Sequence, residues 1–255
     1  YDEYTLSLLT PLYKDLSNNE DNEETWRKNL RSLTKTFLCK AGYEPCIEEA
    51  REEYRKWMEA PNPDEGNPIA NQYICPVFKW GSMDEWLFGL DRVVNFPSSR
   101  KPSERTYLLK TLAGCPRDDV KISKLLQLST MTNNGNFSDT DVFLIFSMLT
   151  SSPKGYTTLF EFLRSNFDAL KEKYISNTNL WDSLITAATS HFTTKEGLNR
   201  VRSLAEERAG QFGSAAHIVE NSLKIIAEEA KWSDMNIPVI KDWLADYLVE
   251  IKKSS

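Results

Sequence analysis

The sequence predicts an all-α protein. Apolar residues recur every three or four positions along most of the chain, which is the period of a helix with one buried face. Strand signals, in which apolar and polar residues alternate, are almost absent. Gly42 follows one apolar helical pattern and Pro45 begins the next, and these are the usual stop and start signals of consecutive helices. Residues 33–57 are therefore expected to form a helical hairpin.

This hairpin unit is expected to recur along the chain. Glycines that follow one apolar segment and precede another are 33 to 42 residues apart, at Gly42, Gly81, Gly114, Gly155 and Gly197. A period of this size is typical of helical-repeat proteins. Because no fixed repeat signature accompanies it, the sequence predicts an irregular solenoid of antiparallel helix pairs, a HEAT- or armadillo-like superhelix. We expect residues 1–255 to form a single domain of this kind.

Apolar spacing and breaker residues place the individual helices. The expected helices are 3–16, 24–38, 45–57, 83–94, 104–112, 118–128, 139–150, 156–170, 180–192, 198–207, 215–231 and 237–251. In the second of these, the apolar stripe is expected to comprise Trp26, Leu30, Leu33 and Phe37. Polar or Pro- and Gly-rich segments at 17–24, 61–68 and 130–138 are expected to be loops.

Charge and hydropathy exclude two classes of partner. Net charge is −6, and acidic and basic residues are interspersed along the predicted helices, so there is no basic stripe for phosphate binding and nucleic acid is not an expected partner. The longest apolar run, residues 142–149, is far shorter than the roughly 20 residues of a membrane span. A membrane is expected to be reached only through segments outside this chain. Neither end resembles a signal peptide or an anchor, and we interpret the chain as part of a longer protein.

Catalytic motifs are absent from the sequence. It contains no H-E-x-x-H or C-x-x-C pair, no Gly-rich phosphate loop and no G-x-S-x-G elbow. The two histidines, His191 and His217, fall in separate expected helices without a second ligand one turn away, so packing or surface roles are expected. The abundant carboxylates are expected on solvated helix faces. We predict no catalytic residue, metal ligand or cofactor site in this chain.

The cysteines carry more information. Cys39 and Cys46 flank the turn of the hairpin, and Cys75 and Cys115 lie near turns about one repeat apart. Of the three possible pairings, this placement favours Cys39 with Cys46 and Cys75 with Cys115. Four free thiols in a cytosolic repeat protein are the alternative. Asn136 begins an N-glycosylation sequon in an expected loop, which adds a little support to the secretory interpretation.

Several short motifs together resemble one known family. They are the cysteine hairpin with Ala50 and Trp57, Tyr73-Ile74-Cys75, Gly81 with Trp86, Cys115, the segment 155–167 ending in Asn166-Phe167, His191-Phe192 with Leu204, and residues 225–232 with Trp243-Leu244. In this order they resemble the C-terminal helical domain of aminopeptidase N-like zinc metallopeptidases, the gluzincin aminopeptidases. The likeness covers about residues 1–250. The family's zinc motif and its G-A-M-E-N substrate loop have no counterpart here, so no catalytic residue can be transferred.

The resemblance implies a function and a setting. The chain would be the non-catalytic C-terminal domain of a membrane-anchored or secreted enzyme that removes N-terminal residues from peptides, and it would lack its own first helices and the upstream catalytic domain. It would cap the active-site cleft and shape the peptide chamber, and the zinc ion would belong to the parent enzyme. Its partners would be the catalytic domain and peptide substrates. The family's two disulfides join Cys39 to Cys46 and Cys75 to Cys115 in this numbering. The location implied is the extracellular face of the plasma membrane or the exterior.

A second class of function is compatible with the same residues. A cytosolic HEAT-like scaffold would bind another protein on its concave face, as stacked helix pairs do. The state of the thiols distinguishes the two, because the scaffold would carry four free cysteines.

Overall fold

Helices account for the regular structure of the described chain. The computed structural model describes residues 1–17, 24–66, 69–132 and 135–254, and contains no strand within them. The prediction of an all-α fold is confirmed. Contacts divide the chain into two compact units, residues 1–85 with 238–255 and residues 86–237. The single domain and the solenoid stacking remain predictions.

The first unit is built from four helices, the start of a fifth and the end of the last one. They are α1 (Asp2–Leu16), α2 (Thr25–Ala41), α3 (Glu44–Met58), the short η1 (Asn71–Tyr73), α4 (Ile74–Trp80), the first turn of α5 (Met83–Val94) and residues 238–254 of α13 (Ala216–Ser254). α1 packs on α2, α2 on α3 and α3 on α4. Tyr54 and Trp57 of α3 are buried with Phe78 of α4, as the apolar pattern of 45–57 predicts. The Tyr54 hydroxyl donates to the Glu85 carbonyl at 2.9 Å, so this buried polar group is satisfied.

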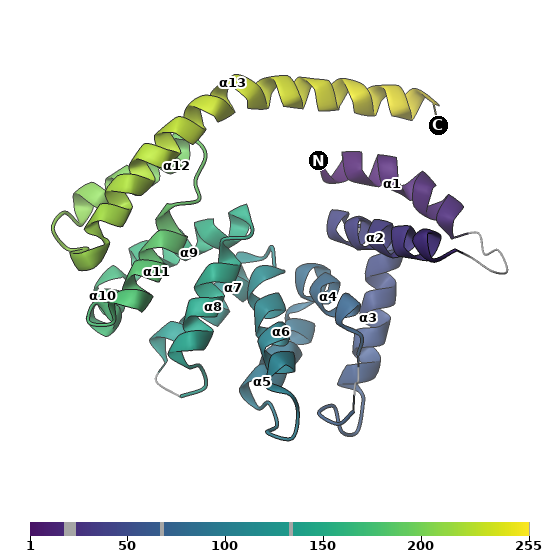
Figure 1. The fold of residues 1–255 in the computed structure, drawn as a ribbon, viewed down its shortest axis with the longest axis horizontal. Coiled ribbons are helices and arrows are strands. Elements are labelled where there is room, and N and C mark those ends of the chain that lie inside the picture. The colour runs from purple at the N-terminus through teal and green to yellow at the C-terminus, as the bar shows by residue number, and fades with distance from the viewer. Residues whose placement is uncertain (18–23, 67–68, 133–134, 255) are drawn as a thin grey trace. The chain divides into compact units, whose positions relative to one another are not determined.

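The second unit consists of the remaining helices. They are residues 86–94 of α5, α6 (Pro102–Gly114), α7 (Asp119–Leu126) with a π turn (Gln127–Met131), α8 (Asp139–Leu149), α9 (Pro153–Ser165), α10 (Phe167–Tyr174), α11 (Thr178–Thr189), α12 (Lys195–Glu207), a short η3 (Gly213–Ala215) and the first part of α13. Figure 1 shows α6, α8 and α11 following one another, and α8 packs on both of the others. α7 packs on α9, which also packs on α11. Each of these helices thus contacts a helix beyond its neighbour in sequence.

The core of the second unit is aromatic. Trp86, Phe146, Phe160, Phe167 and Trp181 are all fully buried. The Trp181 indole donates to the Phe212 carbonyl at 2.7 Å, and the Trp86 indole donates to the Leu112 carbonyl at 3.2 Å. Both rings therefore bury a large apolar surface without leaving a donor unpaired.

The apolar stripe expected on α2 is not the buried one. Trp26, Leu33 and Phe37 are about half exposed, whereas Thr34, Leu38, Cys39 and Ala41 are buried. The reason is that α2 packs on both α1 and α3, and these contacts, together with the turn at Gly42, decide which face is covered. This part of the prediction is wrong.

Three helix predictions need other corrections. The expected helix 156–170 is split into α9 and α10 at Asn166, whose side chain donates to the Phe162 carbonyl and competes with the backbone. The expected pair 215–231 and 237–251 is the single helix α13, in which residues 232–236 contain no glycine and continue the helix. Pro238 lies inside it, although a proline removes one backbone donor and its ring crowds the carbonyl of the preceding turn. The expected helix 180–192 ends at Thr189, so His191 and Phe192 lie beyond it.

The predicted loops agree less well with the structure around residue 130. The π turn continues the chain to Met131, and Thr130 is buried with its hydroxyl donating to the Leu126 carbonyl at 2.7 Å. Residues 133 and 134 of this expected loop, residues 18–23 of the first and residues 67–68 of the second lie outside the described residues.

Two of the recurring glycines have a role other than a turn. Gly155 and Gly197 lie in the first turns of α9 and α12, where their amides donate to the capping hydroxyls of Ser152 and Thr194. A Cβ atom at Gly155 would lie 2.1 Å from the Leu149 carbonyl oxygen. These glycines therefore permit close packing at the start of a helix. Gly42, in contrast, ends α2 in the left-handed conformation, as predicted for a turn.

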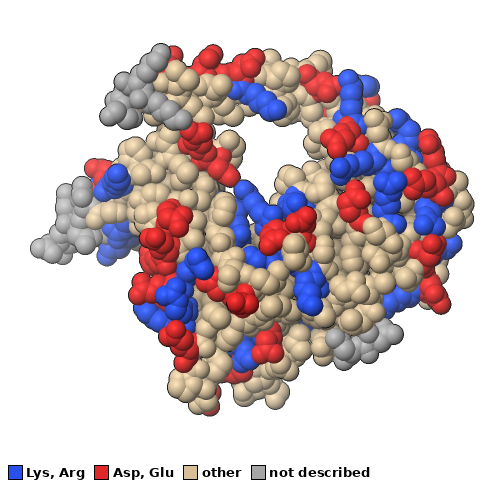
Figure 2. Space-filling model, turned by 180° about the vertical axis from the view of Figure 1, so that it is seen from behind, with Lys and Arg blue, Asp and Glu red and all other residues tan. Residues whose placement is uncertain are grey.

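Charged side chains of both signs are interspersed on the surface. Figure 2 shows Lys and Arg next to Asp and Glu over the face that it draws. Exposed pairs such as Lys56–Glu53 at 2.6 Å and Arg164–Glu207 at 2.9 Å are typical of this surface. Pairs of this kind contribute little to stability, at most about 1 kcal/mol each.

Candidate functional site

The four cysteines lie at helix ends or near them. Cys39, near the end of α2, and Cys46, in the first turn of α3, are joined by a disulfide with their Cα atoms 5.4 Å apart. Cys75 lies at the start of α4 and Cys115 follows α6. None of the four is a free thiol.

The other residues singled out by the sequence lie on the surface or at its edge. Asn136 is partly exposed, and its carbonyl accepts a hydrogen bond from Arg105 at 3.4 Å, two residues before Ser138 caps α8. His217 is exposed, with its Nδ1 atom 2.8 Å from the Ser214 carbonyl oxygen. His191 is half-buried and stacks on Tyr156 with ring centroids 6.0 Å apart. Glycosylation of Asn136 stays a prediction.

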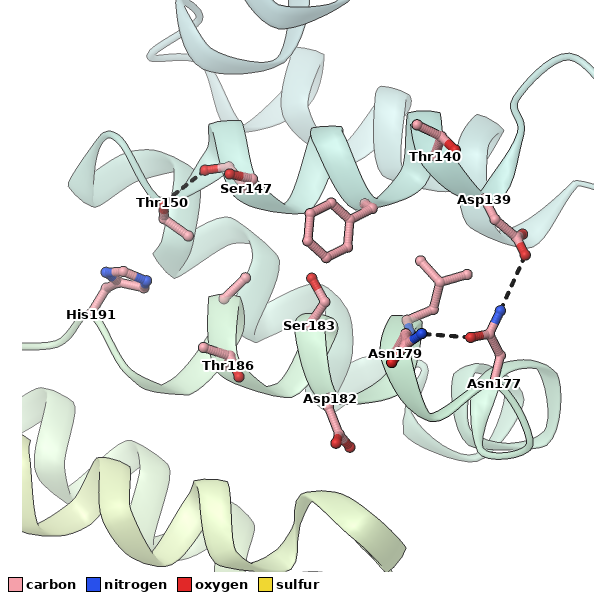
Figure 3. Close-up of a pocket in the computed structure, with 13 residues that line it drawn as sticks. Asp139, Thr140, Ser147, Thr150, Asn177, Asn179, Asp182, Ser183, Thr186 and His191 are labelled. Carbon is pink, nitrogen blue, oxygen red and sulfur yellow. Dashed lines mark hydrogen bonds between the residues drawn. The ribbon is translucent and has the colours of Figure 1, made fainter.

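The described structure contains a groove on the second unit that the sequence does not reveal. It has a volume of about 840 Å³ and is formed by α8 and α11, so we call it the α8–α11 groove. Figure 3 shows His191 and Asp139 at its opposite ends. Its lining residues are Asp139, Thr140, Phe143, Ser147, Thr150, Asn177, Asn179, Leu180, Asp182, Ser183, Thr186, Ala187 and His191.

Helical spacing explains why α8 presents a polar edge to the groove. Val142, Ile145, Phe146 and Leu149 are buried and hold the helix on its neighbours. The groove residues of α8 recur three or four positions apart on another face, as one side of an α-helix requires. A capping box fixes the start of the helix, since Ser138 and Asp141 exchange hydrogen bonds of 3.2 and 3.0 Å. The orientation of this edge is therefore set by both packing and capping.

The other wall is anchored by α11. Trp181, Leu184 and Ile185 are fully buried, and Asn177 caps the helix with a hydrogen bond from the Leu180 amide at 3.4 Å. Asp182, Ser183 and Thr186 line the groove with part of their surface exposed. Figure 3 shows the Ser183 side chain turned toward α8 and the Asp182 carboxylate turned away from it. The buried side chains of Leu180 and Ala187 form the apolar floor.

The charge of the groove is negative. Asp139 and Asp182 line it, and no Lys or Arg does. Burial lowers the pKa of His191, so its imidazole is neutral at pH 7 and does not offset the carboxylates. The pKa of Tyr174 is raised to about 12, mainly by burial of the Tyr174 hydroxyl and secondly by the negative charge of Asp139. Carboxylates, hydroxyls and two amides above an apolar floor are groups suited to binding a peptide or another polar ligand.

The sequence can indicate the polar face of each helix that lines the groove, but not that the two helices are neighbours. Small polar residues at helical spacing in 139–150 and 179–186 indicate polar faces, yet nothing in the sequence shows that helices 30 to 40 residues apart are neighbours. His191 and His217, the histidines considered from the sequence, are not part of a metal centre in the described chain, which contains no group of three His, Cys, Asp or Glu side chains able to hold an ion. The described residues therefore form no site that fits a zinc ion. No helix among the residues that the structure covers has an apolar stretch long enough to cross a membrane.

Comparison with known proteins identifies the family. The family model described as "ERAP1-like C-terminal domain" matches residues 1–228. The chain belongs to this family. This ERAP1-like C-terminal domain is 25% identical to endoplasmic reticulum aminopeptidase 2 of Homo sapiens over 244 residues, which are 94% of the chain and 24% of the relative. It is similar to endoplasmic reticulum aminopeptidase 1 of Homo sapiens, with 25% identity over 250 residues, 96% of the chain and 25% of the relative.

The same likeness extends to aminopeptidase N of Homo sapiens, with 24% identity over 254 residues that are 95% of the chain and 25% of the relative. The resemblance to gluzincin aminopeptidases is thereby confirmed. The ERAP1-like C-terminal domain spans about a quarter of the length of these relatives.

Proposed function

We propose that this chain is the non-catalytic C-terminal part of a zinc aminopeptidase that removes N-terminal residues from peptides, and that it caps the active-site cleft and shapes the chamber that receives the peptide. The observation that carries the proposal is the family match over residues 1–228. Its support within the chain is the α8–α11 groove, a concave surface of about 840 Å³ with polar walls.

Zinc chemistry in this proposal belongs to the upstream catalytic domain, which would be the chain's partner in the same polypeptide. The described residues offer no ligand set, so this chain would bind or orient the peptide and exclude water, which is a gating role. Chemistry at the metal would use residues that lie outside this sequence.

The setting proposed for the protein is the extracellular face of the plasma membrane or the exterior. The disulfide between Cys39 and Cys46 supports an oxidising compartment, because such bonds do not persist in the cytosol. We further infer that Cys75 pairs with Cys115. Peptide mapping without reductant tests this: a linked pair of peptides containing these two residues is expected, and a crossed pairing would contradict it.

The experiment that tests the function compares two substrates in the full-length polypeptide with and without residues 1–255. One substrate is a chromogenic amide of a single amino acid, and the other is a longer peptide with the same N-terminal residue. A domain that shapes the chamber changes kcat/KM for the two substrates by different factors, because only the longer peptide can reach it. An equal loss on both substrates, in proportion to the loss of folded protein, would mean that the domain is only a structural support.

A further inference from the structure

Helix α2 carries a row of apolar side chains that is largely uncovered in the described chain. The row consists of Trp26, Leu30, Leu33 and Phe37, and we call it the α2 stripe. Trp26, Leu33 and Phe37 are 58%, 55% and 47% exposed. Their spacing of three or four residues places all four within about 60° of one another around the helix axis. Single exposed apolar residues are normal, but a row of this kind is typical of a contact surface.

The α2 stripe adjoins the face by which the helix is already packed. The buried residues Thr34, Leu38 and Ala41 occupy the neighbouring sector of the helix circumference. Contacts with α1 and α3 therefore cover only part of a wide apolar arc. An amphipathic helix normally buries the whole of such an arc. The uncovered part indicates that α2 has one more neighbour.

The neighbouring helix α1 is also incompletely covered, whereas α12 is not. Leu8 and Leu12 of α1 are one turn apart and are 49% and 36% exposed. The exposed side chains of α12, in the second unit, are all polar. A helix with a finished outer surface in this protein thus looks like α12. The α1–α2 pair lacks such a surface.

A second copy of the chain fits the α2 stripe poorly. Three half-exposed side chains of roughly 200 Å² each present on the order of 300 Å². A stable complex between separate molecules buries about 800 Å² on each partner. A segment of the same polypeptide needs less contact area, because its effective concentration beside the stripe is high. The area therefore favours an intramolecular partner.

A lipid surface is another candidate, because α2 has basic side chains and no acidic one. Two of the basic side chains are engaged within the chain, since Arg27 contacts Asp15 at 3.6 Å and Lys35 contacts Glu49 at 2.6 Å. Lys28 lies on the side of the helix opposite the stripe, by helical spacing. Basic heads thus do not flank the stripe as they do in a helix that lies on a membrane. The chemistry favours an apolar protein surface.

We propose that, in the full-length polypeptide, a helix of the segment that immediately precedes residue 1 covers the α2 stripe. The proposal rests on the proposed function in one respect, that this chain is the C-terminal part of a longer enzyme. It is supported by the family description and by the quarter of the relatives' length that the chain spans. α1 joins residue 1 to α2 and packs on it, so a preceding segment enters beside the stripe. Side chains three or four residues apart form the ridges on which another helix packs.

Hydroxyl-radical footprinting of the full-length polypeptide tests the proposal with a matched pair of rings. Phe37 and Phe143 are 47% and 51% exposed in this structure, so without a further neighbour they are oxidised at similar rates. A side chain in the core of an interface is closed to solvent, so we expect Phe37 to react about tenfold more slowly than Phe143. Equal rates at the two rings would overturn the proposal.

A charged side chain in the stripe tests the same contact by its stability. Leu33→Lys places a charge under the covering helix, so the unfolding temperature of the full-length polypeptide is expected to fall by about 5 °C or more. Phe37 should then be oxidised about as fast as Phe143. Val120→Lys is the control, because Val120 is 62% exposed on α7. It should shift the unfolding temperature by less than about 2 °C. Equal shifts for both variants would contradict the proposal.

Photo-cross-linking identifies the occupant. With p-benzoylphenylalanine at position 37 of the full-length polypeptide, we expect an intramolecular adduct in the segment just before residue 1. An adduct to a second polypeptide, to added lipid vesicles or to a distant part of the chain would overturn the proposal. Failure of the proposed function has a different signature, namely equal loss of both substrates in the deletion experiment while Phe37 stays protected in the full-length polypeptide.

Discussion

Among the glycines of the described chain that were compared for an added Cβ atom, Gly155 leaves the least room for one. An added Cβ atom would lie 2.1 Å from the Leu149 carbonyl oxygen, and that oxygen belongs to the backbone of α8 and cannot rotate away. Gly155→Ala is therefore expected to lower the free energy of unfolding by about 3 kcal/mol or more. Urea unfolding followed by circular dichroism measures this.

Gly114→Ala is the matched control. Its added Cβ atom would meet the Met148 carbonyl oxygen at 3.5 Å, an ordinary contact. Because alanine favours helix over glycine, the change should be neutral or stabilising by up to about 1 kcal/mol. Equal effects at positions 155 and 114 would refute the close approach of α9 to the end of α8.

The Arg105–Asp141 pair makes the stability of the second unit depend on pH. Arg105 donates from Nη1 to Asp141 Oδ1 at 2.7 Å and from Nη2 to Oδ2 at 3.0 Å, and the two side chains are 26% and 13% exposed. Burial by itself would raise the pKa of Asp141, but the hydrogen bonds from Arg105 and Ser138 and the charge of Arg105 hold it below its ordinary value. At low pH the unfolded chain therefore binds a proton more readily than the folded one.

The sign of the resulting prediction follows from this lowered pKa. The ionised Asp141 carboxylate contributes its full stabilisation of the fold above its ordinary pKa of about 4. That contribution is lost as pH falls through the lower pKa that Asp141 has in the folded state. Asp141→Asn should cost about 2 kcal/mol at pH 7 and flatten the decline of stability between about pH 5 and pH 3. Arg105→Met should also flatten this decline of stability with falling pH. Combining Arg105→Met with Asp141→Asn should flatten the decline no further than either change alone. A decline as steep in Asp141→Asn as in the parent chain would contradict this account.

At the scale of elements, α2 shows what apolar spacing can and cannot predict. Its period identified a helix whose bounds, Thr25–Ala41, differ from the expected 24–38 by a few residues. The period did not identify the covered face, because Leu33 and Leu38 both belong to apolar rows and the packing of α2 on α1 and α3 decides between them. The split at Asn166 and the continuity of α13 have the same origin, since local breakers compete with packing that the sequence does not display.

One pair of identical substitutions on α2 tests the assignment of its faces. Leu38 is fully buried, so Leu38→Ala is expected to cost about 2 to 5 kcal/mol in the free energy of unfolding. Leu33 is 55% exposed, so Leu33→Ala should change it by about 0.5 kcal/mol or less. Denaturant unfolding of the chain measures both. A larger loss for Leu33→Ala than for Leu38→Ala would mean that the face predicted from spacing alone is the buried one, and would contradict the observed orientation of α2.

For the whole molecule, the sequence supplied the fold class and the family but not the groove. Turn signals such as Gly42 and Pro45 are local, and the family motifs around Cys39, Gly81 and Asn166-Phe167 are short, so both can be found without knowing contacts. The α8–α11 groove depends on two helices being neighbours across α9 and α10, which is a property of packing.

Photo-cross-linking in the full-length polypeptide tests the central claim, that peptide substrates contact this domain, most directly. A cleavable peptide carrying a benzophenone side chain is incubated with the enzyme, irradiated, and its adducts are mapped by mass spectrometry. We expect adducts on α8 and α11, around Phe143 and Ser183, that an unlabelled peptide competes away. Adducts confined to the upstream domain, while the enzyme still cleaves the probe, would contradict the claim.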